Sequence, residues 1–130
     1  MSQKLTCHCG SVELRVTLAQ DPSEAMLCDC SFCRRRMVPN VDVKLSDLTI
    51  VKGHECLTLY TWGTGTAKHY FCRNCGIYTH HQRHSRPDVY GVNIGALEGV
   101  HPSAFAPFGW VDGGNHQSDK KTRTNQARDH

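Results

Sequence analysis

Residues 28–33 read Cys28-Asp29-Cys30-Ser31-Phe32-Cys33, and this stretch decides the fold because it gathers three thiols within six residues. We call Cys28, Cys30 and Cys33 the trio. Thiolates are preferred zinc ligands, and closely spaced cysteines of this kind are typical of zinc sites. A structural zinc ion takes four protein ligands, whereas a catalytic zinc ion keeps one position open for water or substrate. The trio therefore predicts a zinc site with three protein ligands.

Two further thiol pairs flank the trio. They are Cys7-His8-Cys9-Gly10 before it and Cys72-Arg73-Asn74-Cys75-Gly76 after it. A Cys-x-x-Cys-Gly at a strand end is typical of a zinc knuckle, in which a tight turn aims both sulfurs at one point. Geometry favours joining the two pairs in one structural site, because that site would close a long loop. The rival pairing puts Cys72 and Cys75 with two thiols of the trio, and spacing alone leaves both open.

The fourth ligand of the trio's zinc ion is open at this stage. Water, a substrate thiol, Cys56 or a histidine such as His69 could supply it. If the position is open, a zinc ion that bears thiolates suits a sulfur ligand, which it binds as thiolate near neutral pH. Such a thiolate is a nucleophile for a small electrophile such as an aldehyde.

Length and composition indicate one small domain that metal ions help to fold. The chain has 130 residues and eight cysteines. No apolar segment has the length of a membrane span, and residues 1–6 lack the apolar run of a signal peptide. We therefore expect a cytoplasmic protein with no membrane partner. In a reducing compartment, eight cysteines argue for metal binding rather than for disulfides.

The charge argues against a nucleic-acid partner. The formal net charge is +3, but seven thiolates with two zinc ions would contribute about −3 and cancel it. The chain then lacks the basic excess that a nucleic-acid surface needs. A small-molecule partner is the better prediction, and the oligomeric state stays open.

Alternating apolar residues predict a mainly β fold. Val12, Leu14 and Val16 alternate along 11–18, which is the period of a half-buried strand. The other predicted strands and strand candidates are 25–27, 41–45, 48–51, 57–62, 66–71 and 89–97. The Gly-rich turn 63–65 joins two of them as a hairpin, and no segment has the pattern of an amphipathic helix. We expect one zinc domain over 1–112 and a polar flexible tail over 113–130.

Two groups of charged or titratable residues are candidates for substrate contacts and proton transfer. Arg34 and Arg35 follow the trio directly, and guanidinium groups suit the carboxylates of an acidic thiol. The alternative for these arginines is a solvated face. His80 and His81 follow the knuckle and could act as proton shuttle or as ligand at the open zinc position, with His84 a weaker candidate.

The order of these motifs resembles the glutathione-dependent formaldehyde-activating enzyme family, which also includes centromere protein V. The likeness covers about residues 5–112 and includes the basic run Arg34-Arg35-Arg36 after the trio, the knuckle and the segment 90–97. It implies an Mss4-like, mainly β fold with two zinc ions. By position it assigns Cys28, Cys30 and Cys33 to a catalytic zinc ion. It assigns to a structural zinc ion the four thiols of the flanking pairs, which are Cys7, Cys9, Cys72 and Cys75.

The resemblance also implies a reaction, the addition of glutathione to formaldehyde to give S-hydroxymethylglutathione, which is classed with the carbon–sulfur lyases. Applied to this chain as a hypothesis, the trio's zinc ion binds the thiolate, the aldehyde carbon is attacked, and a nearby acid protonates the alkoxide. Met37 stands where a glycine often follows the basic run in this family, and Ala96 where relatives can carry cysteine. The alternatives are a zinc enzyme acting on another thiol adduct and a non-enzymatic module with two zinc ions.

Overall fold

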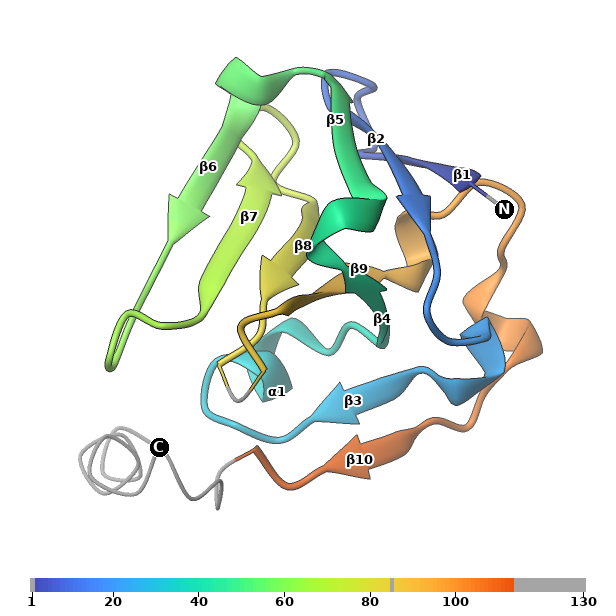
Figure 1. The fold of residues 1–130 in the computed structure, drawn as a ribbon. Coiled ribbons are helices and arrows are strands. Elements are labelled where there is room, and N and C mark those ends of the chain that lie inside the picture. The colour runs from blue at the N-terminus through green and yellow to red at the C-terminus, as the bar shows by residue number, and fades with distance from the viewer. Residues whose placement is uncertain (1, 85, 114–130) are drawn as a thin grey trace.

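The computed structural model describes residues 2–84 and 86–113, which form two β-sheets (Figure 1). The three-stranded sheet has the order β1 (Ser2–Thr6), β2 (Glu13–Thr17) and β5 (Leu48–Lys52). The seven-stranded sheet has the order β10 (Gly109–Val111), β3 (Met26–Cys28), β4 (Asn40–Lys44), β9 (Val89–Asn93), β8 (Tyr78–Gln82), β7 (Lys68–Cys72) and β6 (Leu57–Tyr60). The predicted mainly β single domain is confirmed.

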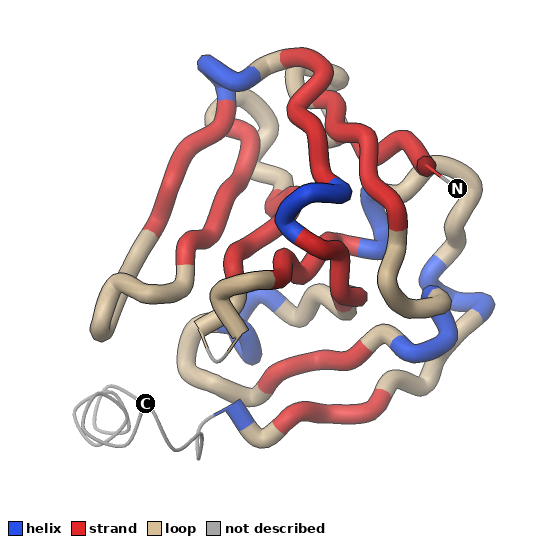
Figure 2. Tube along the Cα trace, in the orientation of Figure 1, coloured by secondary structure: helices blue, strands red, loops and turns tan. Residues whose placement is uncertain are grey.

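Helices are short throughout the described residues (Figure 2). The α-helix α1 spans only Cys33–Arg36, directly after the first two thiols of the trio. The 3-10 turns are η1 (Pro22–Glu24), η2 (Leu45–Asp47), η3 (His54–Cys56), η4 (Ile94–Ala96) and η5 (Pro102–Ala104). In residues 2–84 and 86–113 no helix is long and apolar enough to cross a membrane.

The core lies where the two sheets face each other. Val12, Leu14 and Val16 on the β2 side are fully buried, as their alternation predicts. Val41 and Val43 of β4 are fully buried in the same cluster. Burying one such aliphatic side chain contributes about 1.5–3 kcal/mol. Because side chains alternate along a strand, the residues between these valines face the other side of the large sheet.

The ends of several predicted strands differ from the structure. β9 stops at Asn93 instead of Leu97, because the Asn93 side chain accepts a hydrogen bond from the Gly95 amide at 2.8 Å and caps η4. Leu45 lies in η2 and is 38% exposed, so it does not continue the alternation of β4. β1, β8 and β10 were not predicted at all. The β8 sequence is mostly polar, which hides its strand character from a pattern of apolar residues.

The basic run ends at a left-handed residue. Met37 is the C-cap of α1 with φ 52° and ψ 45°, and its amide donates to the Cys33 carbonyl at 2.9 Å. A glycine would adopt this backbone conformation without steric cost, which explains why a glycine suits the position. Of the predicted tail 113–130, only Gly113 belongs to the described residues, so the domain boundary stays a prediction.

Candidate metal centres and active site

The two flanking thiol pairs meet in space. Cys7 and Cys9 lie in the turn between β1 and β2, and Cys72 and Cys75 lie at the turn between β7 and β8. The four sulfurs all lie within 4.8 Å of one another. We call this group the four-cysteine cluster. Because β1 and β2 belong to the small sheet and β7 and β8 to the large one, the cluster joins the two sheets. The rival pairing with the trio is not the one that the structure has.

The geometry of the four-cysteine cluster fits a tetrahedral metal ion such as zinc. The Cys9 sulfur lies 3.6 Å from that of Cys7 and 3.7 Å from that of Cys72. Four bonds of about 2.3 Å in a tetrahedron place sulfurs about 3.8 Å apart. Backbone amides of Val12 and Asn74 point at the Cys7 and Cys72 sulfurs at 3.3 and 3.4 Å. Amides in these positions stabilise thiolates.

The trio forms a second cluster at the end of β3. Its three sulfurs lie within 4.8 Å of one another. The Cys33 amide donates to the Cys30 sulfur at 3.3 Å, and Arg36 Nη2 donates to the Cys33 sulfur at 3.4 Å. Three clustered thiols, two of which have donors aimed at their sulfurs, fit a metal ion that has three protein ligands. Such a site leaves one coordination position for a ligand from outside the cluster.

Neither side chain considered as a fourth ligand joins the trio. Within residues 2–84 and 86–113, the trio is grouped with no other cysteine, histidine or acidic side chain at ligand spacing. Cys56 lies instead by the knuckle, where Asn74 Nδ2 lies 3.6 Å from its sulfur. His69 is near the trio, but its ring nitrogens do not belong to the cluster.

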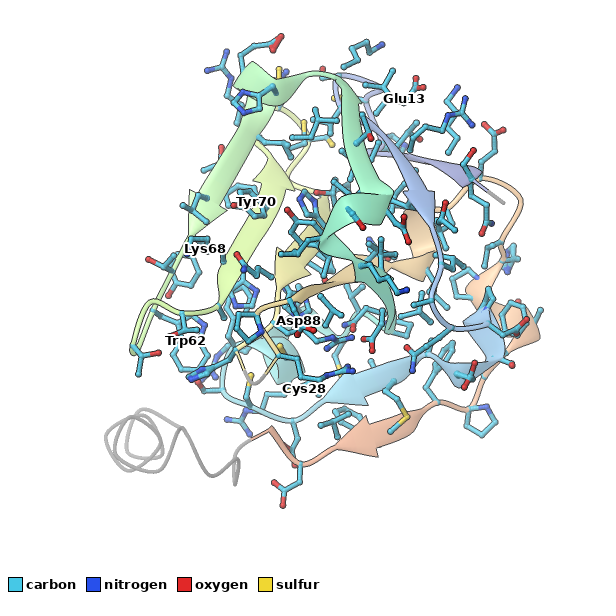
Figure 3. All side chains as sticks on the ribbon, in the orientation of Figure 1. Glu13, Cys28, Trp62, Lys68, Tyr70 and Asp88 are labelled. Atoms are coloured by element: carbon cyan, nitrogen blue, oxygen red, sulfur yellow. The ribbon has the colours of Figure 1, made fainter. Side chains whose placement is uncertain are left out.

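A cavity of about 340 Å³ opens beside the trio. All three thiols line it, together with charged and polar residues of the large sheet and with Trp62 from the start of the β6–β7 hairpin loop. In Figure 3 the labelled Cys28 and Trp62 both lie in the lower part of the molecule. The main polar residues of its walls are Asn40, Asp42, His69, His81, Arg83 and Arg86.

Strand pairing explains how distant residues reach this cavity. Tyr60 pairs with His69, His69 with His81, His81 with Gly91, and Gly91 with Asp42. These five residues form one row across β6, β7, β8, β9 and β4. Paired residues in antiparallel strands present their side chains on the same face of the sheet. The row therefore lies on the face opposite to Val41 and Val43, and its two histidines and Asp42 line the cavity.

Gly91 makes room for the polar side chains of this row. A Cβ at Gly91 would lie 2.6 Å from the His81 ring and 2.9 Å from Asn40 Oδ1. We expect Gly91→Ala to lower the free energy of unfolding by about 1–3 kcal/mol, because buried groups must shift. Urea unfolding measures the change. Gly95→Ala is the control, since its Cβ meets nothing closer than 3.2 Å and should cost less. Equal stabilities of the two variants would contradict this account.

Tyr78 orients His81. The two residues are three apart, so strict alternation would put them on opposite faces, but the register of β7 with β8 shifts between Tyr70 and Phe71. Tyr78 Oη then lies 2.6 Å from His81 Nδ1 and donates to the Gly91 carbonyl at 3.1 Å. Because a carbonyl oxygen only accepts, the arrangement that satisfies all three groups has Tyr78 Oη donating to Gly91 and Nδ1–H of His81 donating to Tyr78, which leaves a lone pair on Nε2 of His81. Burial lowers the pKa of His81 well below its usual value, and the ring is neutral.

His80 points elsewhere. Its ring stacks on Tyr70 with centroids 4.6 Å apart, and its Nδ1 lies 2.8 Å from Thr79 Oγ1. Burial lowers the pKa of His80 to about 4. Among the described residues that line the cavity, His80 is absent and His81 present. Of the three candidate histidines, His81 and the weaker candidate His84 therefore line the space beside the trio, and His80 does not.

The arginines of the basic run also differ from one another. Arg34 and Arg35 are exposed and do not line the cavity as described, and Arg35 Nη1 donates to the Ser31 carbonyl at 2.6 Å. The third member, Arg36, turns inward. Its guanidinium carbon lies 4.7 Å from the centroid of the Phe32 ring and 3.7 Å from that of the Tyr78 ring.

Two arginines that sequence analysis missed lie in the cavity wall. Arg83 Nε and Nη2 each lie 2.7 Å from Asp42 Oδ1, and Arg86 contacts the other carboxylate oxygen. Arg83 Nη2 also donates to Asn40 Oδ1 at 2.8 Å. Two guanidinium groups on one buried carboxylate leave a net positive charge at this wall. The alternation in β4 could have indicated this polar wall, because it places Asn40 and Asp42 together on the face away from the core.

Comparisons with known proteins agree with this arrangement. A family described as glutathione-dependent formaldehyde-activating enzyme matches residues 2–109, a range that contains both cysteine clusters. The crystal structure of a Rhodobacter sphaeroides protein, a structural genomics target, is 56% identical to this chain. The match covers 83% of this chain and 99% of that chain, with a TM-score of 0.81. The two chains therefore share the fold described above.

Proposed function

The chain belongs to the glutathione-dependent formaldehyde-activating enzyme family, and on that premise we propose that it is a zinc-dependent enzyme of the carbon–sulfur lyase type. It adds a thiol, glutathione or a related one, to formaldehyde or another small carbonyl compound. One observation carries this proposal: the trio has three clustered sulfurs at the wall of a cavity with a neutral histidine and two arginines. A closed structural site would have four protein ligands and would not need a cavity beside it.

The trio holds the catalytic zinc ion in this proposal, and the four-cysteine cluster holds the structural one. When bound at the trio, zinc supplies the acidity that turns a thiol into a thiolate near neutral pH. Arg36 and the Cys33 amide stabilise the negative charge on the trio's sulfurs through the hydrogen bonds described above. These contacts hold the sulfurs in place while the substrate exchanges.

The remaining polar residues of the cavity bind the substrates and move the proton. His81 Nε2, with its lone pair, accepts the proton that the substrate thiol loses. The thiolate sulfur attacks the carbonyl carbon, so that one C–S bond forms and the C=O π pair moves to oxygen. His81 returns the proton to that oxygen, and the product is a hydroxyalkyl thioether with no change in redox state. The lowered pKa of His81 favours the return of the proton, whereas acceptance of the proton depends on the acidity that zinc would give the thiol.

Charge at the cavity wall favours a thiol that carries carboxylates. Arg83 and Arg86 are fixed by Asp42 and offer guanidinium groups toward the cavity. A free carboxylate of glutathione or a similar acidic thiol suits these groups. Arg34 and Arg35 remain candidates only for an outer part of a longer thiol, because they are exposed. Another thiol adduct with an acidic group would use the same residues.

Metal content and sulfur ligation test this proposal together with turnover. Elemental analysis is expected to give two zinc ions per chain, and X-ray absorption a set of three sulfurs with one light atom that gains a sulfur when glutathione is added. Exchange NMR with ¹³C-formaldehyde and glutathione should show faster adduct formation with the protein than without it. Two sites with sulfur ligands only, whose ligation does not change when glutathione is added, together with an unchanged rate of adduct formation, would overturn the proposal and favour a structural or binding protein.

A further inference from the structure

His69 presents a buried polar atom that has no partner. Among the described residues, the buried side-chain nitrogen or oxygen atoms without a hydrogen-bond partner are Arg36 Nε, Trp62 Nε1 and His69 Nε2. Two of these belong to residues that line the cavity beside the trio, Trp62 and His69. His69 is only 4% exposed and lines the cavity, so a partner for Nε2 must come from within the cavity. Buried polar groups nearly always have partners, and an exception at a cavity wall indicates a ligand.

Arg36 determines which nitrogen of His69 carries the proton. Its Nη1 lies 3.2 Å from His69 Nδ1. A guanidinium group only donates hydrogen bonds and stays charged in proteins, so Nδ1 must accept. The neutral ring then carries its proton on Nε2. The unpartnered atom is therefore an N–H donor rather than a lone pair.

Arg36 is itself held firmly in place. Its guanidinium group lies between the rings of Phe32 and Tyr78, and its Nη2 donates to the Cys33 sulfur at 3.4 Å. The Phe32 ring also packs against His69, with centroids 4.5 Å apart. These contacts couple the orientation of His69 to the trio. They also keep His69 from acting as a metal ligand through Nε2, because Nδ1 would then need a proton and would face a second donor on Arg36.

His69 and His81 have opposite polarity. Their rings stack with centroids 5.1 Å apart. Tyr78 leaves a lone pair on Nε2 of His81, whereas Arg36 leaves a proton on Nε2 of His69. The cavity thus offers one acceptor and one donor from neighbouring strands. Addition of a thiol to a carbonyl group uses both kinds, because the thiol loses a proton and the carbonyl oxygen gains negative charge.

We propose that His69 is a catalytic residue whose Nε2–H donates a hydrogen bond to the carbonyl oxygen of the substrate, and that Arg36 is a positioning residue that sets the His69 tautomer. This inference rests on the proposed function. The C–S bond forms as the C=O π pair moves to oxygen, and His69 stabilises the resulting alkoxide without giving up its proton. The proton that completes the hydroxyl group is the one lost by the thiol.

The tautomer can be measured without any assay of activity. Nitrogen-15 NMR of histidine-labelled, zinc-loaded protein near neutral pH should show His69 with a protonated Nε2 and an unprotonated Nδ1. Arg36→Met keeps a side chain of similar length but removes the donor, and the nitrogen-15 signals of His69 should then show a mixture of tautomers. Arg36→Lys keeps a donor and should preserve the Nε2–H form, as should the control Arg15→Met on β2. A protonated Nδ1 in the wild-type protein would refute the inference.

Kinetics test the catalytic role. His69→Phe keeps a ring in the stack but removes the donor, and we expect kcat to fall about 10²-fold with little change in the KM for the thiol. His69→Gln offers a replacement N–H and should recover part of that loss. The exposed His101→Phe is the control and should keep full activity. If the wild-type chain accelerates the reaction and His69→Phe matches it, His69 has no such role. If the wild-type chain itself is inactive, the proposed function fails while the tautomer result stands.

Discussion

Cys72→Ala is expected to abolish the soluble, folded state. Cys72 is fully buried and belongs to the cluster that joins the two sheets. A structural zinc ion contributes an apparent binding free energy of about 10–16 kcal/mol in small zinc domains. The whole stability of a domain is about 5–15 kcal/mol, so loss of one ligand removes a comparable amount. Soluble yield, circular dichroism and bound zinc per chain measure the result.

Cys56→Ala is the matched control for this variant. Cys56 is a neighbour of the knuckle but belongs to neither cluster as described. It should fold and keep two zinc ions per chain. A soluble Cys72→Ala protein with unchanged thermal unfolding would show that the four-cysteine cluster does not stabilise the fold.

Cys30→Ser is expected to remove activity while the structural metal stays bound. Cys30 lies between the other two thiols of the trio in the sequence, and its sulfur accepts a hydrogen bond from the Cys33 amide. A hydroxyl group is a poor zinc ligand beside thiolates, so the catalytic ion is lost or misplaced. Loss of several kcal/mol of charge stabilisation corresponds to a fall in kcat/KM of about 10³-fold or more.

The metal count distinguishes this outcome from unfolding. Cys30→Ser should keep one zinc ion per chain and a native circular dichroism spectrum, because the four-cysteine cluster is on another part of the sheet. Cys56→Ser serves as the control and should keep both ions and full turnover. Unchanged turnover in Cys30→Ser would remove the trio from the mechanism.

Much of the fold could be predicted from local patterns. The alternation in 11–18 correctly predicted β2 and its buried face, and the Gly-rich turn 63–65 correctly predicted a hairpin. β8 was missed because it carries polar side chains on both faces, the one that lines the cavity and the opposite one. A strand of this kind carries no apolar period, so only its pairing with β7 and β9 reveals it.

The candidate site divides in the same way. Spacing predicted the trio, loop closure favoured joining the two flanking pairs over the rival pairing, and position after the knuckle drew attention to His81. The same position equally suggested His80, which points away, and position after the trio suggested Arg34 and Arg35, which are exposed. The cavity instead contains Arg83 and Arg86, which are more than 40 residues from their partner Asp42. No local pattern records a contact over that separation.

Local spacing predicted which thiols lie close together in the two cysteine clusters that could hold metal ions. Thiols a few residues apart must lie close together in any fold, because the chain between them is too short to separate them. Only the tertiary structure decided what stands beside the trio. The row from Tyr60 to Asp42 depends on the register of five strands, and the contact of Tyr78 with His81 depends on one irregularity in that register. A shift by one residue would turn each side chain to the opposite face, so non-local pairing determines the chemistry of the cavity.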